Sequence, residues 1–291
     1  MRRALLPLLL ASAACTPAAT QTQVVSTDVP PPAATAEGYD LGAQYAKLAV
    51  IEMAPDTSFL TQEERDVVNL LIEASGYMDE IYLRQRGADL PQMREAISRD
   101  RRADRDLLLA MFDRNFGPWD EVAELHPFWG TEPMPEGAGF YPADLTREEF
   151  DAYLAANPDQ REVLTSPYTV VRRSADGFVA VPYSQAYREW LVPAARLLEQ
   201  AAQRTSNPSL KRFLSLRAAS FLTDDYFESE MAWMDLEGTP IEIAIGPYEV
   251  YTDRLYGTKT AFESFVTLRN PAESAALAKY KNYLRTMEEN L

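Results

Sequence analysis

Hydrophobic residues recur at helical spacing over much of the chain. After the tetrapeptide TQEE at 61–64, apolar residues follow at intervals of three and four, which is the period of one face of an α-helix. The tetrapeptide itself is a capping box, with Thr61 as N-cap and Glu64 three residues later. The pattern predicts a helix from 61 to about 86. Its apolar positions are Val67, Leu70, Leu71, Ala74 and Met78.

A second helical pattern begins at Leu90 and continues until Gly117-Pro118. Its middle, SRDRRADRD at 98–106, interleaves charges of both signs, as is typical of a solvated helix face. We therefore expect one helix over this span. The following segment, 126–143, is rich in proline and glycine and predicts a long loop. Its aromatic residues should pack against the rest of the fold; they are Phe128, Trp129, Phe140 and Tyr141.

The second half of the chain mixes helices with short strands. Thr146 followed by Glu149 is a second capping box, and Asp176-Gly177 between two β-prone runs predicts a hairpin over 168–181. Helices are expected at 184–204, 208–221 and 223–236, with Thr223 and Asp224 available to cap the last one. The alternating IEIAI at 241–245 predicts a strand, and a final helix should begin near 271. The sequence thus predicts an α+β domain over 39–291, predominantly helical with a few short antiparallel strands.

The N-terminus has the features of an export signal. Two arginines precede a short apolar run, and the small residues after it lead to Cys15, the only cysteine. We interpret 1–14 as a signal peptide, 15–38 as a lipid-anchored flexible tether, and Cys15 as the lipidation site of a bacterial cell-envelope protein, with the outer membrane as its location. A plain secretory signal cleaved nearby is the alternative. With no second cysteine, disulfides cannot brace the fold.

The charge balance argues against one class of partner. With 28 basic and 44 acidic residues the formal net charge is −16, and such a surface repels phosphate backbones. We expect no nucleic-acid partner.

Catalytic constellations are scarce. His126 is the only histidine, and no HExxH or CxxC motif is present, so neither a zinc site nor a histidine-based nucleophile can be assembled from known patterns. His126 is interpreted as a loop residue. Four carboxylates lie on one expected helix and predict a solvated face, with a hard cation as the alternative; they are Asp224, Asp225, Glu228 and Glu230. We assign no catalytic residue and no metal ligand.

The segment 241–265 is unusual for its density of special residues. Gly246-Pro247 predicts a turn after the strand, and the alternation of Glu249 and Tyr251 places both on one face of an extended segment. Together with Glu263, such a corner could bind a protonated amine through charge-assisted hydrogen bonds. The alternative is a structural corner with surface acids.

Several motifs of this chain resemble those of dipeptidyl-peptidase III-like zinc peptidases, in their bacterial branch. The segment 249–266 resembles a family pattern of E-x-Y-x-D, then G, then F-E-x-F-V. Four other stretches support the resemblance, which covers most of 60–291: GFYPADLTREEF (139–150), SPYTVVRRSADG (166–177), VPYSQAY (181–187) and DDYFESEMAWMDL (224–236).

The resemblance implies one lobe of a two-lobed metallopeptidase that releases dipeptides from the free N-terminus of short peptides. It implies that Glu249 and Glu263 bind the peptide's amine with Tyr251 nearby. Zinc is expected in the full-length family enzyme, on helices C-terminal to this segment, and no motif here corresponds to them. We therefore expect the N-terminal, non-zinc part of such an enzyme, inactive without a C-terminal catalytic portion. A non-catalytic peptide-binding or scaffold lipoprotein is the alternative, and a helical domain without a ligand is a third.

Overall fold

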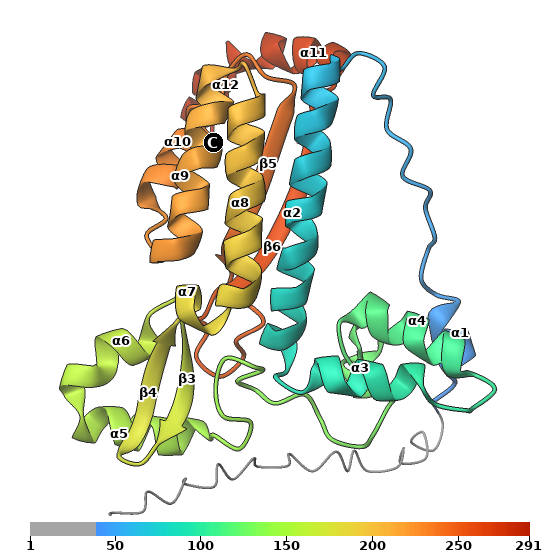
Figure 1. Cartoon of the computed structure of the whole chain (residues 1–291), viewed down its shortest axis with the longest axis vertical. Coiled ribbons are helices and arrows are strands. Elements are labelled where there is room, and N and C mark those ends of the chain that lie inside the picture. The colour runs from blue at the N-terminus through green and yellow to red at the C-terminus, as the bar shows by residue number, and fades with distance from the viewer. Residues whose placement is uncertain (1–38) are drawn as a thin grey trace, which may run out of the picture. The chain divides into compact units, whose positions relative to one another are not determined.

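The computed structural model describes residues 39–291 (Figure 1). The interpretations of 1–14, Cys15 and 15–38 lie outside the described residues. The helices are α1 (Leu41–Tyr45), α2 (Gln62–Arg86), α3 (Leu90–Ser98), α4 (Arg105–Asn115), α5 (Arg147–Ala156), α6 (Arg161–Thr165), α7 (Tyr183–Ala186), α8 (Arg188–Arg204), α9 (Pro208–Thr223), α10 (Phe227–Met234), α11 (Pro271–Lys281) and α12 (Leu284–Glu289). Two 3₁₀ helices are η1 (Glu121–Ala123) and η2 (Pro158–Gln160).

The strands form three separate antiparallel pairs. They are β1 (Trp119–Asp120) with β2 (His126–Pro127), β3 (Thr169–Ser174) with β4 (Gly177–Pro182), and β5 (Ile241–Glu249) with β6 (Ala261–Leu268). The expected fold class, predominantly helical α+β with short antiparallel strands, is confirmed. In Figure 1 the long β5–β6 hairpin runs alongside α2 and α8, and α2 packs against both β6 and α8. None of the helices within 39–291 combines the length and apolar character needed to cross a bilayer.

Helix α2 forms as its sequence predicts. The Thr61 hydroxyl accepts from the backbone N–H of Glu64 at 3.2 Å, and the Glu64 carboxylate accepts from the N–H of Thr61 at 2.7 Å, so two of the unpaired donors of the first turn are satisfied. The buried face includes Val67, Leu71, Ala74, Met78 and Ile81. One more contact ties the helix to the hairpin, a hydrogen bond of 2.7 Å between the hydroxyls of Ser75 and Ser264.

The prediction of a single helix from Leu90 to 116 is wrong. The chain forms α3 and α4 with a break at 99–104. At the break the Asp100 carboxylate accepts from the backbone N–H of Arg102 at 2.8 Å, and Arg102 pairs with Asp104 at 2.9 Å. Aspartate bonded to its own nearby backbone competes with the helix ladder, which explains why the charged stretch bends the chain rather than forming a solvated helix face.

The loop and the second hairpin follow the prediction more closely. Phe128, Trp129, Phe140 and Tyr141 are all buried, so the loop aromatics do pack into the core. Gly177, the first residue of β4 directly after the turn, has φ +121°, a conformation that favours glycine. The hydroxyl of Thr146 caps α5 by accepting from the N–H of Glu149 at 3.1 Å.

Helices α9 and α10 form, but the predicted cap of α10 does not. Helix α9 ends at Thr223, its C-cap Asp224 is in the left-handed region, and α10 begins only after Tyr226. Thr223 and Asp224 therefore do not cap α10 as expected. The Asp224 carboxylate instead accepts from the N–H and the hydroxyl of Ser184, at 2.9 and 2.6 Å, and fixes the start of α7.

Candidate functional site

The hairpin β5–β6 brings the two glutamates of the predicted site onto one face. Glu263 pairs with Gly246, and Glu249 pairs with Ala261. A β-bulge between Pro247 and Glu249 inserts one extra residue in β5. Without it Tyr248 would lie opposite Ala261 and Glu249 would point to the other face, because side chains alternate along a strand. The predicted turn at Gly246-Pro247 is wrong, since β5 continues through both residues to Glu249.

The charges of these groups influence one another. The pKa of Glu263 is raised by burial and then by the charge of Glu249. The pKa of Tyr251 is raised by burial and then by Glu263, with smaller effects from Tyr82 and Glu249. Within 39–291 neither glutamate makes an ion pair with a basic side chain. Two acids on one face of a hairpin without a counterion favour a bound cation.

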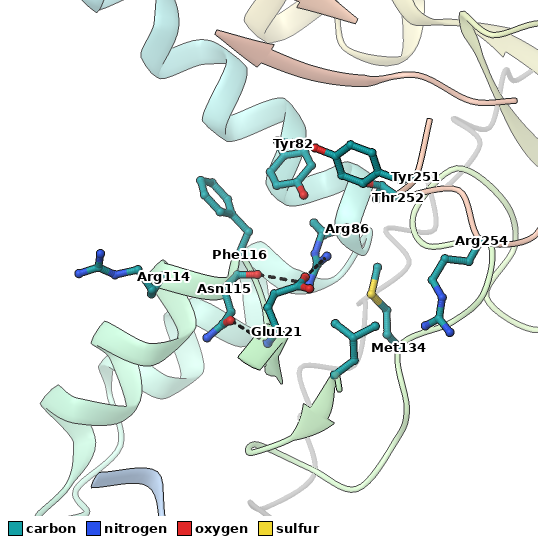
Figure 2. A pocket seen from close by; sticks show the side chains of 11 residues that line it. Tyr82, Arg86, Arg114, Asn115, Phe116, Glu121, Met134, Tyr251, Thr252 and Arg254 are labelled. Carbon is teal, nitrogen blue, oxygen red and sulfur yellow. Dashed lines mark hydrogen bonds and ion pairs between the residues drawn. The ribbon is translucent and has the colours of Figure 1, made fainter. Parts of the chain in front are cut away.

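Tyr251 lies beyond the strand. The expectation that it continues an extended segment is wrong, because residues 251 and 252 form a turn after β5. Its side chain is 69% exposed, so the ring is accessible beside the glutamates. Tyr251 also borders a cavity of about 300 Å³ (Figure 2).

The loop that carries Tyr251 is held by a buried carboxylate. Asp253 accepts hydrogen bonds from four backbone N–H groups at 2.9–3.1 Å and from the hydroxyl of Tyr141 at 3.1 Å. The four N–H groups belong to Leu255, Tyr256, Thr258 and Lys259. Asp253, part of the E-x-Y-x-D motif, therefore determines the shape of the loop.

Lys259 anchors the same loop to the β3–β4 hairpin region. Its fully buried ammonium donates to the carbonyls of Leu164 and Ser166, both at 2.7 Å, and to the hydroxyl of Thr169 at 2.8 Å. Burial lowers its pKa to about 7, against a smaller opposing effect of Asp253. Sequence reasoning missed this residue, because nothing in the local pattern marks a lysine as buried.

Arg217 contacts the β5–β6 hairpin through a hydrogen bond to β5. It is fully buried on α9, donates to the carbonyl of Ile245 at 3.0 Å and pairs with Glu230 at 2.5 Å. Glu230 is therefore not part of a solvated face as predicted. The guanidinium also lies over the rings of Tyr226 and Tyr248, at 5.3 and 5.5 Å from their centroids, which stabilises a buried cation.

The described residues do not supply a zinc site. Within 39–291 no three histidine, cysteine, aspartate or glutamate side chains are grouped to hold a metal ion. His126 stacks on the ring of Tyr39, with centroids 5.0 Å apart, and lies in β2. The donor set that zinc prefers, several imidazoles or thiolates around one point, is not assembled by these residues.

Comparisons with known proteins show what this chain is similar to. Residues 145–287 match the model of peptidase family M49, a family of metallopeptidases. The fold matches dipeptidyl-peptidase III from Caldithrix abyssi with a TM-score of 0.83 and 46% identity, covering 86% of this chain and 48% of that one. It matches dipeptidyl-peptidase III from Corallococcus sp. strain EGB with a TM-score of 0.80 and 38% identity, covering 86% and 47%.

The predicted resemblance to the dipeptidyl-peptidase III-like family is confirmed. The chain spans about half the length of the two solved relatives. It is also 26% identical over 308 residues to the protein named Nudix hydrolase 3 of Arabidopsis thaliana, covering 88% of this chain and 40% of that protein.

Proposed function

We propose that this chain binds the free amino terminus of a short peptide, as the substrate-binding part of a dipeptidyl-peptidase III-like hydrolase that releases dipeptides. The observation that supports this most is the placement of Glu249 and Glu263 on one face of the β5–β6 hairpin, with Tyr251 beside them and no basic partner within 39–291.

The chemistry follows from charge. An ammonium group donates three hydrogen bonds, and bonds between charged groups are roughly twice as strong as neutral ones. Binding would also relieve the repulsion between the two carboxylates. An acetylated amine has no charge and one donor, so it cannot replace the ammonium. A site of this kind fixes the position of the peptide by its free amino end, which is the requirement for releasing dipeptides.

The hydrolytic step needs a metal in this family, and the described residues do not fit one. We therefore propose that zinc-dependent hydrolysis depends on ligands other than residues 39–291, and that these residues do not cleave peptides by themselves. Stoichiometric zinc binding and dipeptide release by the purified chain would contradict this. A peptide-binding lipoprotein without catalysis is the alternative, favoured by the same lack of clustered metal ligands.

The location is a separate proposal. We propose that residues 1–14 direct export and that Cys15 carries a lipid anchor in the bacterial outer membrane. The supporting feature is the order of the first fifteen residues, in which two arginines are followed by an apolar run and then by small residues up to Cys15. Labelling cells with a fatty-acid analogue tests it: the label should be incorporated in the native chain and lost in Cys15→Ala, and label retained in that variant would contradict it.

The amine-binding proposal is tested by calorimetry on the purified chain with trialanine and N-acetyl-trialanine. The free amine should bind about tenfold or more tightly, the effect of a charged hydrogen bond of about 1.5–3 kcal/mol. Equal affinity for the two peptides would overturn the proposal. Glu242→Gln is the matched control for glutamine substitutions at Glu249 and Glu263. Glu242 is an exposed acid on the same face of β5, opposite Thr267 and away from the pair.

A further inference from the structure

Tyr251 borders a cavity of about 300 Å³ that neither Glu249 nor Glu263 lines. Four segments build it: the end of α2, the stretch from the end of α4 to Leu125, the loop that contains Met134, and the loop after β5. Figure 2 shows the ring of Tyr251 beside that of Tyr82 at the rim. The apolar and aromatic lining comprises Tyr82, Phe116, Leu125 and Met134. The cavity and the amine site therefore share one wall.

The charge of this cavity is opposite to that of the chain. Three arginines and one glutamate line it, although the chain carries −16 overall. The glutamate, Glu121, is occupied by an ion pair with Arg86 at 2.6 Å. In Figure 2 the Arg114 side chain extends away from the cavity. Arg254 also lines the cavity, and within 39–291 its guanidinium has no carboxylate partner.

Two buried polar groups on the cavity also lack partners. The hydroxyl of Thr252, a residue only 3% exposed, and the Nε of Arg86, 5% exposed, make no hydrogen bond within the described residues. Leaving such groups unpaired costs about 1–3 kcal/mol each. Both can donate, as can the Arg254 guanidinium, so the donors around this cavity favour an anion as its ligand.

We infer that this cavity binds a carboxylate of the same peptide whose ammonium lies at Glu249 and Glu263, an inference that rests on the proposed function. Arg254 and Thr252 are the specificity-determining residues. The peptide is thus held by opposite charges at two sites that Tyr251 borders. The carboxylate comes either from an aspartate or glutamate side chain or from the peptide's own C-terminus, two sources with the same chemistry.

Peptide calorimetry on the full chain distinguishes the two sources. The reference peptide is trialanine amide, which has no carboxylate. Trialanine tests the C-terminal carboxylate, and Glu-Ala-Ala amide and Ala-Glu-Ala amide test a side chain, each against its glutamine counterpart. At least one carboxylate-bearing peptide should bind about tenfold to a hundredfold more tightly than its neutral match.

Substitutions assign that gain to the cavity. Arg254→Gln should abolish the preference for the carboxylate and leave the affinity for trialanine amide unchanged, and Thr252→Val should reduce the preference. Arg196→Gln, an exposed arginine on α8 away from the cavity, should change nothing. Thermal melting of each variant checks that it folds.

Two results would overturn the inference. One is equal affinity of every acid and its neutral match in the native chain, and the other is an Arg254→Gln variant that keeps the preference. Both leave the amine proposal intact if N-acetylation still weakens binding. Indifference to N-acetylation, or no measurable binding of any peptide, would instead remove the proposed function and this inference with it.

Discussion

The guanidinium of Arg217 occupies the space that a side chain at Gly246 would need. A Cβ added to Gly246 would lie 2.5 Å from Nη1 of Arg217, closer than any van der Waals contact. Gly246 also has φ +148°, a backbone conformation that other residues adopt only with strain. The position of Arg217 therefore requires a glycine at position 246, directly opposite Glu263.

Gly246→Ala should therefore destabilise the protein. We expect a loss of at least about 2 kcal/mol in the free energy of unfolding, from backbone strain and overpacking against Arg217. Urea unfolding followed by circular dichroism measures it. Gly76→Ala is the control: Gly76 is inside α2 with open space around its Cα, so alanine there should stabilise by about 0.5–1 kcal/mol. Similar stability of Gly246→Ala and the native chain would contradict the close approach.

Glu263→Gln should separate stability from binding. The raised pKa of Glu263 means that its protonated form is favoured by folding, so its contribution to stability is present at low pH and is lost as pH rises through the folded pKa. At pH 7 the neutral glutamine should raise the melting temperature by about 1–3 °C while it weakens peptide binding. A melting temperature that falls, with affinity unchanged, would contradict both halves of the argument.

Lys259 makes a testable contribution to the pH dependence of stability. Its folded pKa of about 7 lies below the value of 10.5 for an ordinary lysine. Between these values the unfolded chain binds more protons than the folded chain, so the free energy of unfolding rises with pH. The contribution of Lys259 to stability is therefore lost as pH falls toward 7. Unfolding measured from pH 7 to 10 should show this rise in the native chain and a smaller one in Lys259→Met. Parallel curves would contradict the assignment.

Asp253→Asn should loosen the loop that positions Tyr251. One carboxylate oxygen becomes an NH₂ group that faces N–H donors, so hydrogen bonds are lost and donors are left unpaired in the interior. We expect a loss of about 2–4 kcal/mol in the free energy of unfolding. Hydrogen exchange of the amides of Thr258 and Lys259 should accelerate, while exchange in the interior of α8 should change less. Unchanged protection of those two amides would show that Asp253 does not hold the loop.

Local signals allowed much of the fold to be predicted from sequence. The capping box at Thr61 and the β3–β4 hairpin depend on residues three or fewer apart, and both form as expected. The turn of the hairpin is at Ala175-Asp176, and Gly177 begins β4. Gly246-Pro247 was misread, because glycine and proline are common in turns and the reason for this glycine is Arg217, 29 residues earlier. The break between α3 and α4 was missed because an aspartate can either face solvent or bond its own backbone.

The candidate site was predicted in part. The motif indicated Glu249, Tyr251 and Glu263, and the hairpin does bring the two glutamates to one face. The β-bulge that makes this possible has no clear local signature. The cavity beside Tyr251 could not be predicted either, because Tyr82, Glu121 and Arg254 come from segments that are distant in sequence and meet only in the folded chain.

The most direct test of amine binding is a cycle that crosses the peptide with the glutamate pair. The affinities of trialanine and N-acetyl-trialanine are measured for the native chain and for the double variant Glu249→Gln/Glu263→Gln. We expect acetylation to weaken binding about tenfold or more in the native chain and to have almost no effect in the double variant, because the partners of the ammonium are gone. The same loss on acetylation in both proteins would show that the ammonium binds elsewhere and that the glutamate pair is not its site.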